Sequence, residues 1–566
     1  MQYTFRHDGD IQKLAEYVTL YETQYKDFRR PSYNETEVRV DFVNPFFKLL
    51  GWDVDNEAGL PQHLREVTHE ATVLVEEAGR KKSKKPDYSF RIGTETCFFL
   101  ETKKPAVDIT TDSAPTFQLR RYGWSGNLKV SVLTNYTDLY IYDCSVRPVE
   151  NDNVGRALIA HYNYREYVEK FDEIYALLSK EAVLSGAFAE RFENIERTIR
   201  REPFDEYFLK QIKGWRLTLG ADIVRRNPSV DLQTLNIGVQ RILNRIIFLR
   251  ICEDRNLEQY EILKNVKTYA ELKALFLAAD RKYDSGLFEV LEEDQLSLSD
   301  DVLIDIFVSL YYPNNSYEFS VVDPFIIGQI YELFLDEQLV ISPDGTVVAE
   351  KKPEAVDDKG AVNTPKNVTD IIVEQTLSEV VQGKTLNEVS QLRIADICCG
   401  SGNFLLSAFE FLINFHIEWH LSRAKDAALR MGYIYQIPGT DEYRLSFELR
   451  RRILTANLFG VDIDPLAVKV SKFSLCLKLL ENASSEELNA FNADPGEKIL
   501  PRLDDNIKNG NSLVSSAYAL FQPDIYNRPD ELKKIRMFDW QAEFGRTGFD
   551  AIVGNNWSPR RERRAA

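Results

Sequence analysis

Short runs of apolar and β-branched residues alternate with helical patterns over the first 180 residues of the chain. The clearest β-like runs are Cys97–Leu100, Leu128–Leu133 and Leu139–Tyr142. Strands of this length, separated by segments of helical period, are typical of a sheet that is covered by helices. We therefore predict an α/β domain over residues 1–180.

Helical periodicity replaces the strand pattern between residues 185 and 345. Apolar residues recur there at the spacing of a helix face, most clearly in the set Ile242, Leu243, Ile246, Ile247, Leu249 and Ile251. This pattern predicts a helical connector over residues 185–345. The stretch Ser342–Pro365 is rich in Gly, Pro, Asp and Lys, and it is the best candidate for a linker.

Strand, glycine-turn and helix signals alternate again between residues 355 and 566. A doubly wound parallel sheet requires this order of elements. The pattern along the whole chain therefore predicts an α/β multidomain protein with three parts, namely residues 1–180, 185–345 and 355–566.

Composition agrees with several packed domains. The 566 residues carry 70 Lys plus Arg against 88 Asp plus Glu, a formal net charge of −18, and 44% of the residues are hydrophobic. These values exclude a disordered, collagen-like or disulfide-scaffold protein. The six cysteines form no C-x-x-C pair, so neither a disulfide framework nor a zinc cluster is indicated.

The amino-terminal sequence MQYTFRHDGD carries charges where a signal peptide would be apolar, and no run of 18 apolar residues follows it. We therefore expect a cytoplasmic protein that has no membrane partner. The net charge does not decide whether the chain binds DNA, because contacts with phosphate depend on local basic patches.

Two acids and a lysine are expected to meet near the end of a β-hairpin. Asp87 opens one β-like run, Gly93 and Thr94 supply a turn, and the returning run ends in Glu101 and Lys103. Side chains alternate along a strand, so Glu101 and Lys103 share a face, and the hairpin brings Asp87 alongside them. Carboxylates are ligands that Mg²⁺ prefers, and a lysine beside the ion can hold or deprotonate an attacking water. The pattern predicts cleavage of phosphodiesters, with Asp87 and Glu101 as metal ligands.

These residues resemble the PD-(D/E)xK nucleases. Two flanking elements add to the resemblance: a helix signal that contains Glu35, and Gln118 with Tyr122, which are similar to the Q-x-x-x-Y element of type I restriction subunits. The resemblance implies that all six residues, namely Glu35, Asp87, Glu101, Lys103, Gln118 and Tyr122, belong to the catalytic site. Glu37 is an alternative to Glu35, although the spacing to Arg39 favours Glu35.

Two alternatives stay open here. An E-x-K tripeptide at a strand end can be an ordinary charged edge. The four lysines that precede the site are equally compatible with phosphate contacts and with a solvated loop; they are Lys81, Lys82, Lys84 and Lys85.

A second constellation follows a buried strand at residues 392–397. Gly400 and Gly402 form a turn that lets the backbone approach a ligand, and a further strand ends in Asp462. In a dinucleotide site the acid follows the glycines by about 20 residues. Asp462 comes about 60 residues later and the full G-x-G-x-x-G is missing, which disfavours such an enzyme.

These features resemble the S-adenosylmethionine pocket of the methyltransferases that modify adenine in DNA. Lys359–Pro365 is similar to the family's G-A-x-Y-T-P segment, with Asn363 in place of tyrosine, and Ile507–Leu513 is similar to the loop near the cofactor's adenine. The resemblance implies that the glycine loop approaches the methionine part and that the acid binds the ribose hydroxyls. The implied cofactor contacts are Thr364, Asp396, Gly400, Gly402, Asp462 and Asn511.

The catalytic N-P-P-Y motif of that family is only partly present. Asn555 stands at its first position, but Asn556, Trp557 and Ser558 follow. Four arginines among the last seven residues are typical of a frameshift or a premature stop. We therefore expect the cofactor to bind without methyl transfer by this chain alone.

The order of nuclease, helical connector and methyltransferase resembles the Eco57I-like type IIG restriction-modification enzymes, up to Asn555. That family implies Mg²⁺, S-adenosylmethionine and double-stranded DNA. Two alternatives remain: methylation as the main activity, in a longer chain or with a separate specificity or completing polypeptide, and a non-catalytic fragment for binding or assembly. His416 and His420 have the spacing of two zinc ligands, but we interpret them as ordinary helix-face residues because no third ligand is nearby.

Overall fold

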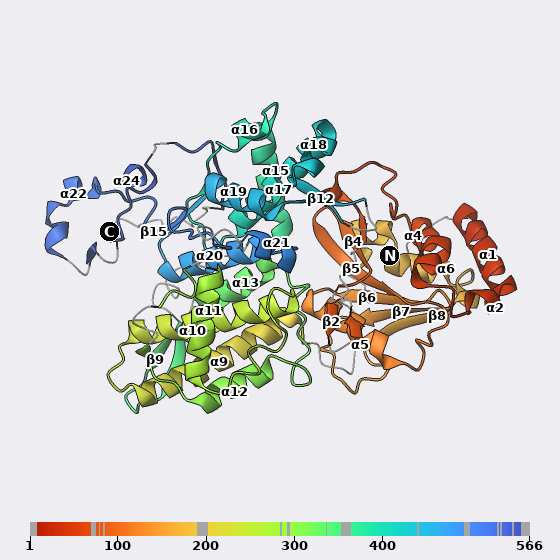
Figure 1. Cartoon of the computed structure of the whole chain (residues 1–566), viewed down its shortest axis with the longest axis horizontal. Helices are drawn as coiled ribbons and strands as arrows, with labels where there is room; N and C mark the ends of the chain where they lie inside the picture. Colours follow the sequence, from red (N-terminus) through yellow and green to blue (C-terminus); the bar gives the residue numbers. More distant parts are fainter. Residues whose placement is uncertain are drawn as a thin grey trace, which may run out of the picture. The chain divides into compact units, whose positions relative to one another are not determined.

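The computed structural model describes residues 8–69, 75–77, 80–82, 85–188, 202–283, 286–290, 295–335, 337–351, 364–437, 441–491, 498–528, 531–532, 535–545 and 548–555 (Figure 1). The chain divides into two compact units. Unit 1 comprises Met1–Phe208, Val308–Val322 and Gln436–Glu442, and unit 2 comprises Leu209–Phe307, Asp323–Tyr435 and Tyr443–Ala566. The predicted limits 1–180, 185–345 and 355–566 stay predictions.

Unit 1 is built on a six-stranded sheet with the order β1-β4-β5-β6-β7-β8. Its strands are β1 Val67–His69, β4 Tyr88–Ile92, β5 Glu95–Thr102, β6 Val130–Thr134, β7 Asp138–Asp143 and β8 Leu158–Asn163. All neighbours are antiparallel except β5 and β6, which are parallel and are joined by helix α5, Ser113–Ser125. The predicted hairpin and the two later strands are therefore confirmed.

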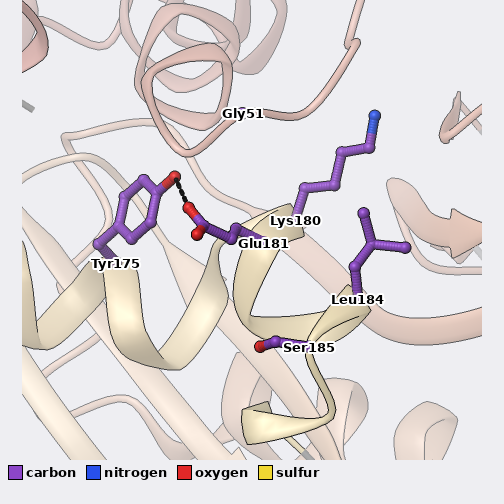
Figure 2. A pocket seen from close by; sticks show the side chains of 6 residues that line it. All are labelled: Gly51, Tyr175, Lys180, Glu181, Leu184 and Ser185. Carbon is purple, nitrogen blue, oxygen red and sulfur yellow. Dashed lines mark hydrogen bonds between the residues drawn. The ribbon is translucent and has the colours of Figure 1, made fainter. Parts of the chain in front are cut away.

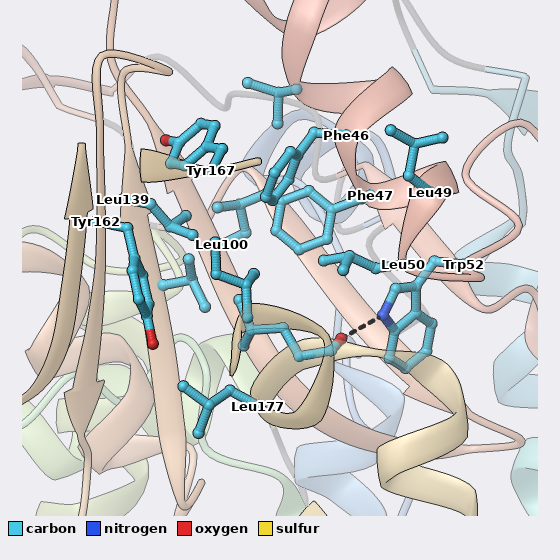
Figure 3. Close-up of a cluster of buried hydrophobic side chains, with 14 of the residues drawn as sticks. Phe46, Phe47, Leu49, Leu50, Trp52, Leu100, Leu139, Tyr162, Tyr167 and Leu177 are labelled. Carbon is cyan, nitrogen blue, oxygen red and sulfur yellow. Dashed lines mark hydrogen bonds between the residues drawn. The ribbon is translucent and has the colours of Figure 1, made fainter. Parts of the chain in front are cut away.

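The two faces of this sheet carry separate cores. Phe98 and Leu100 of β5 pack with helices on one face, where Trp52 donates a hydrogen bond from Nε1 to the Leu178 carbonyl at 2.8 Å (Figure 3). Phe99, between them, packs on the opposite face with Leu119 of α5. Because side chains alternate along a strand, Glu101 belongs to the α5 face and Thr102 to the other face.

Short helices frame this sheet. They are α1 Asp8–Thr23, α2 Tyr25–Phe28, α3 Glu35–Val38, the π-helix η1 Arg39–Val43, α4 Asn44–Leu49, η2 Gln62–Leu64, η3 Tyr164–Glu166, α6 Phe171–Leu178 and α7 Lys180–Leu184. A separate ladder pairs β2 Val75–Glu77 with β3 Arg80–Lys82.

Residues 308–322 also belong to the core of unit 1. Tyr317 is buried and stacks on Trp124 of α5, with ring centroids 5.9 Å apart. Arg121, also on α5, donates a hydrogen bond to the Tyr317 carbonyl at 2.7 Å. This late segment therefore braces the helix that carries Gln118 and Tyr122.

The first part of unit 2 is helical, as the periodicity predicted. Its helices are α9 Phe204–Arg226, which begins in unit 1, α10 Leu232–Asp254, α11 Tyr269–Tyr283, α12 Asp300–Ser309 and α13 Pro324–Leu335. The expectation of a linker over Ser342–Pro365 is wrong for its first part, because β9 Glu337–Ile341 and β10 Val347–Lys351 form an antiparallel hairpin. Asp344 and Gly345 make its turn, with Gly345 at φ +82°. An Asp-Gly pair between β-branched residues is a local signal for such a hairpin turn.

The second part of unit 2 contains a parallel sheet with the order β15-β14-β11-β16. Its strands are β11 Ile394–Asp396, β14 Leu458–Asp462, β15 Ile507–Asn509 and β16 Ala551–Ile552. The mixed α/β class and the parallel strands are therefore confirmed. In parallel sheets, ligands bind at the carboxyl ends of the strands, where β11, β14 and β15 here end in Asp396, Asp462 and Asn509.

The other elements of this part are α15 Lys366–Val381, α16 Leu386–Val389, α17 Asn403–Arg423, α18 Lys425–Arg430, the hairpin strands β12 Ile434–Gln436 and β13 Tyr443–Leu445, α19 Phe447–Asn457, α20 Pro465–Leu479, α21 Ser485–Phe491, α22 Tyr518–Phe521, η5 Pro523–Asn527 and α24 Trp540–Phe544. Across the described ranges, we find no helix with the length and apolar character needed to cross a bilayer.

Replacing Tyr317 by alanine should destabilise unit 1. Loss of a buried aromatic ring leaves a cavity, so the free energy of unfolding should fall by about 3 kcal/mol. Urea denaturation followed by near-ultraviolet circular dichroism measures this. Tyr526→Ala is the matched control, because that ring is 61% exposed. Equal midpoints for the two variants would contradict the bracing role of residues 308–322.

Candidate functional site

Asp87 and Glu101 lie at the same end of the β4–β5 hairpin, close enough for their charges to interact. Tyr88 pairs with Leu100 in the antiparallel register, so Asp87, one residue earlier, lies opposite Glu101. Asp87 Oδ2 accepts hydrogen bonds from the backbone N and from Oγ1 of Thr102, both at 2.7 Å. The hairpin and Thr102 together fix the Asp87 carboxylate.

Glu101 is almost fully buried, at 2% exposure. Its Oε1 receives a hydrogen bond from Lys103 Nζ at 2.6 Å, whereas Oε2 has no hydrogen-bond partner among the described residues. Burial, and then the negative charge of Asp87, raise the pKa of Glu101 above its ordinary value. A buried acceptor without a partner is costly, so the geometry suits the binding of a further group at Oε2.

The donor set fits Mg²⁺. This ion is usually held by one or two carboxylates, with water and substrate phosphate completing its shell. Asp87 and Glu101 supply two carboxylates, and Oε2 of Glu101 is available. Among the described residues, this site included, no group of three or more His, Cys, Asp or Glu side chains could hold a metal ion by itself. Two protein carboxylates are therefore the most that this site offers from the hairpin.

Gln118 and Tyr122 lie beside Glu101, as predicted. Gln118 Nε2 donates to Tyr122 Oη at 3.1 Å and approaches Glu101 Oε1 at 3.5 Å. Both residues come from α5, which packs on the face of the sheet that carries Glu101. The predicted i, i+4 pair thus meets the predicted acid.

Glu37 is committed to a structural role. Asn34 caps α3, and the Glu37 carboxylate accepts a hydrogen bond from the Asn34 backbone N at 2.7 Å, which closes a capping box. Glu35 instead contributes its negative charge to the environment of Glu101 and Lys103. The geometry therefore favours Glu35 over Glu37 in the cluster.

The lysines before the site are only partly described. Lys84 lies outside the described residues, and only the backbone of Lys81 and Lys82 in β3 is described. Their predicted contact with phosphate therefore stays a prediction.

Three loops meet at the carboxyl ends of the parallel strands in unit 2. Asp462 accepts hydrogen bonds from the backbone N of Gly400 at 2.9 Å and of Asp464 at 2.8 Å. Its own carbonyl accepts one from the backbone N of Gly510 at 2.9 Å. Asp462 thus ties the glycine loop to the loop that carries Asn511.

Gly402 is required by its surroundings. Its φ is +91°, and a Cβ there would come within 2.6 Å of Ser471 Oγ on α20. Only glycine therefore allows this left-handed turn between Asp396 and α17 to pack so closely against α20. Asp396 accepts a hydrogen bond from the backbone N of Cys398 at 3.1 Å, and burial raises its pKa to about 7.

Asn511 and Thr364 are engaged within the protein. Asn511 Oδ1 accepts from the backbone N of Leu513 at 3.1 Å, which shapes its loop. Asn555 Nδ2 donates to Thr364 Oγ1 at 3.3 Å, so residues 191 positions apart in the sequence meet. Residues 359–363, including Asn363, and residues 556–566, including Trp557, lie outside the described residues.

One further hollow lies in unit 1, with a volume of about 400 Å³ (Figure 2). It is lined by Gly51, Tyr175, Lys180, Glu181, Leu184 and Ser185. Its charged groups are already paired, Lys180 with Glu66 and Glu181 with the Tyr175 hydroxyl. None of the predicted site residues lines it.

Sequence reasoning missed three residues of these sites. Thr102 is the unspecified residue of the E-x-K pattern, Arg39 entered only through its spacing from Glu35, and Ser471 lies far from the glycine loop in sequence. Arg39 forms an ion pair with Asp87 and donates from Nε to Thr102 Oγ1 at 2.7 Å. For Thr102 the sequence did carry one signal, because a hydroxyl between two charged residues can orient neighbouring charged groups.

The histidine pair is buried within unit 2. Neither ring nitrogen of His416 has a hydrogen-bond partner among the described residues, and His420 lies one turn later on α17. Burial lowers the pKa of His416 to about 4, and a second, smaller contribution comes from His420.

Unit 2 should therefore lose stability in mild acid. The unfolded chain protonates His416 below about pH 6.5, whereas the folded chain resists protonation, so stability falls between about pH 6.5 and 4. His416→Leu should remove up to about 3 kcal/mol of this loss. Urea denaturation at pH 7 and pH 4.5 measures the difference. The same loss in both proteins would contradict this account of His416.

Comparison with known proteins points to the type II restriction-modification class. The family model described as Eco57I restriction-modification methylase matches residues 456–555, and the N-6 DNA Methylase model matches residues 325–498. These matches include Asp462, Asn511 and Asn555 in the first case, and Asp396, Gly400 and Gly402 in the second.

The chain is Eco57I-like over almost its whole length. It is 38% identical over 551 residues to the type II restriction enzyme and methyltransferase RM.Eco57I of Escherichia coli. This alignment covers 96% of this chain and 52% of that protein. It is 25% identical over 430 residues to RM.MjaORFECS2P of Methanocaldococcus jannaschii, covering 62% of this chain and 34% of that protein. The chain thus spans about half, or less, of the length of these curated relatives. The predicted resemblance to Eco57I-like enzymes is confirmed.

A solved structure of a DrdV–DNA complex is also similar in outline, with a TM-score of 0.31 and 14% identity, covering 94% of this chain and 43% of that one. A likeness this low carries no argument about function.

Proposed function

We propose that this chain is the nuclease and cofactor-binding part of a restriction-modification enzyme, and that it cleaves double-stranded DNA with Mg²⁺. The observation that carries this proposal is the Oε2 atom of Glu101, which is buried, has no hydrogen-bond partner among the described residues, and lies beside Asp87 and Lys103. The similarity to RM.Eco57I over 96% of the chain supports it.

Asp87 and Glu101 would hold the metal ion. When bound, Mg²⁺ supplies a Lewis acid for the phosphate oxygen and lowers the pKa of a coordinated water. Thr102 keeps the Asp87 carboxylate oriented through two hydrogen bonds, so little reorganisation is needed on binding.

Lys103 acts as a cation in this proposal. Burial lowers its pKa, but the charges of Glu101, Asp87 and Glu35 outweigh burial and raise the pKa above its ordinary value. Lys103 is therefore protonated at neutral pH, and it can orient the attacking water and stabilise the charge that develops on the phosphate. Gln118 and Tyr122 hold the Glu101 side of the site in place.

Replacing Lys103 by glutamine should abolish most cleavage. Loss of one preorganised donor should lower the cleavage rate by roughly 10²–10³-fold. Cleavage of plasmid DNA with and without Mg²⁺ measures it. Lys170→Gln is the matched control, because Lys170 forms a surface pair with Glu173. Equal rates for the unsubstituted chain and Lys103→Gln would refute the nuclease assignment.

For unit 2 we propose S-adenosylmethionine as the ligand at the carboxyl ends of β11 and β14. Each carboxylate oxygen of Asp462 accepts one backbone hydrogen bond and keeps capacity for another, which suits ribose hydroxyls. The glycine loop lets the methionine part approach the backbone, and the burial of Asp396 suits a polar group of the cofactor. The N-6 DNA Methylase match over residues 325–498 supports this ligand.

Asp462→Asn should weaken binding of S-adenosylmethionine. Replacing a charged acceptor by a neutral one typically loses a charge-assisted hydrogen bond, so the Kd should rise roughly tenfold to hundredfold. Isothermal titration calorimetry on the whole chain measures this, with Asp344→Asn in the β9–β10 turn as control. An unchanged Kd for Asp462→Asn would contradict the proposed pocket.

Methyl transfer to adenine is the second candidate, favoured by the contact between Asn555 and Thr364. The residues after Asn555 are not Pro-Pro-Tyr, so we propose binding without turnover unless another polypeptide completes the site. Transfer of tritiated methyl groups from the cofactor to duplex DNA by this chain alone would overturn that proposal. Absence of cleavage, of cofactor binding and of methyl transfer would leave the non-catalytic alternative.

A further inference from the structure

A positive side chain already lies at the proposed metal site. The Arg39 guanidinium forms an ion pair with Asp87 Oδ1, and its Nε donates to Thr102 Oγ1 at 2.7 Å. The Arg39 side chain is 20% exposed and that of Asp87 is 9% exposed, so water screens this pair only weakly. Arg39 is therefore part of the electrostatic balance of the site.

The backbone around Arg39 is unusual. One turn of α-helix, Glu35–Val38, passes directly into the π-helix Arg39–Val43. A π-turn adds one residue to a helical turn, and such turns are frequent at functional sites. Here Phe42 and Val43 are buried while Arg39 reaches the hairpin and Glu35 stays near the acids. The π-turn thus lets core and site residues share one short segment.

The two oxygens of Asp87 are not equivalent. Oδ2 accepts two hydrogen bonds from Thr102, which use both of its lone pairs. Oδ1 is left for a metal ion, and it is the oxygen that pairs with Arg39. A divalent cation that binds Asp87 must therefore share Oδ1 with Arg39 or displace it.

The charges around the site agree with this. Asp87, Glu101 and Glu35 are acids that act on Lys103, and among the described residues Arg39 pairs with Asp87 and Lys103 pairs with Glu101. Arg39 is thus the cation in direct contact with Asp87, whereas Lys103 is in direct contact with Glu101.

We propose that Arg39 is a resident counter-ion of the nuclease site, which holds Asp87 in the metal-free chain and competes with the divalent ion for Oδ1. This inference rests on the proposed nuclease function. Arg39 acts through Asp87, so it is a positioning residue rather than a catalytic one. Thr102 keeps Asp87 in place when Arg39 leaves.

The proposal gives two effects of opposite sign for Arg39→Gln. Without metal, the variant should be less stable, because buried Asp87 loses its counter-ion. Its affinity for a divalent ion should rise, by about tenfold, because a competing positive charge is gone. A residue with only a structural role would lower stability and weaken metal binding together.

Titration calorimetry of the whole chain tests this, with Mg²⁺ and with Ca²⁺ as an ion whose binding is measured without cleavage. We expect the Kd to decrease in the order unsubstituted, Arg39→Lys, Arg39→Gln, since the lysine keeps the charge but loses the second guanidinium contact. Arg91→Gln, on β4 of the same hairpin, is the control and should leave the Kd unchanged. Arg39→Lys gives the sign of the effect even where Arg39→Gln fails to fold.

Equal or weaker metal binding in both Arg39 variants would overturn the inference. Glu101→Gln separates this outcome from failure of the proposed function. If the unsubstituted chain binds the ion and Glu101→Gln does not, the metal site stands whatever the Arg39 variants do. If the unsubstituted chain binds no divalent ion, both the site and the role of Arg39 are refuted.

Discussion

The contact between Thr102 and Asp87 is the interaction on which the proposed nuclease site depends. In strand β5, Glu101 lies on the face covered by α5 and Thr102 lies on the face of the aromatic core. Asp87 contacts β5 by accepting hydrogen bonds from Thr102. Gln118 and Tyr122 approach from the α5 face, whereas Arg39 approaches from the other. A register shift of one residue in β5 would exchange these faces and separate every group of the site.

Burial gives this arrangement its chemistry. Glu101 and Asp87 are buried and Lys103 is mostly buried, so their charges interact strongly and an acceptor without a partner is costly. Our proposal places a cation in this site, where Arg39 and Lys103 already pair with the two acids. Unit 2 uses another device, in which Asp462 draws the glycine loop and the Asn511 loop together with backbone hydrogen bonds. One site is organised by paired charges and the other by backbone geometry.

Local sequence signals predicted most of the elements that position these sites. The Gly93 turn and alternating strands gave the β4–β5 hairpin, and Gly400, Gly402 and Asp462 marked the parallel strands that the structure contains. The Asp344–Gly345 turn is also a local signal for the β9–β10 hairpin, although the composition of Ser342–Pro365 is typical of a linker. The spacing to Arg39 favoured Glu35 over Glu37, and the capping box gives Glu37 a structural role.

Other features depend on contacts between distant residues. Nothing in the run Glu35–Val43 predicts a π-turn, since it forms because Phe42 and Val43 are buried while Arg39 reaches Asp87. The packing of Tyr317 on Trp124 joins residues nearly 200 positions apart, so the periodicity of either segment does not predict this contact.

The most direct measurement is anomalous X-ray diffraction from crystals of the chain grown with Mn²⁺, an ion that substitutes for Mg²⁺ in oxygen sites. The account predicts an anomalous peak bonded to Glu101 Oε2 and Asp87 Oδ1, at about 2.1 Å from each, with the Arg39 guanidinium moved away from Oδ1. A manganese position that does not involve Glu101, or no ordered ion at the hairpin, would contradict it.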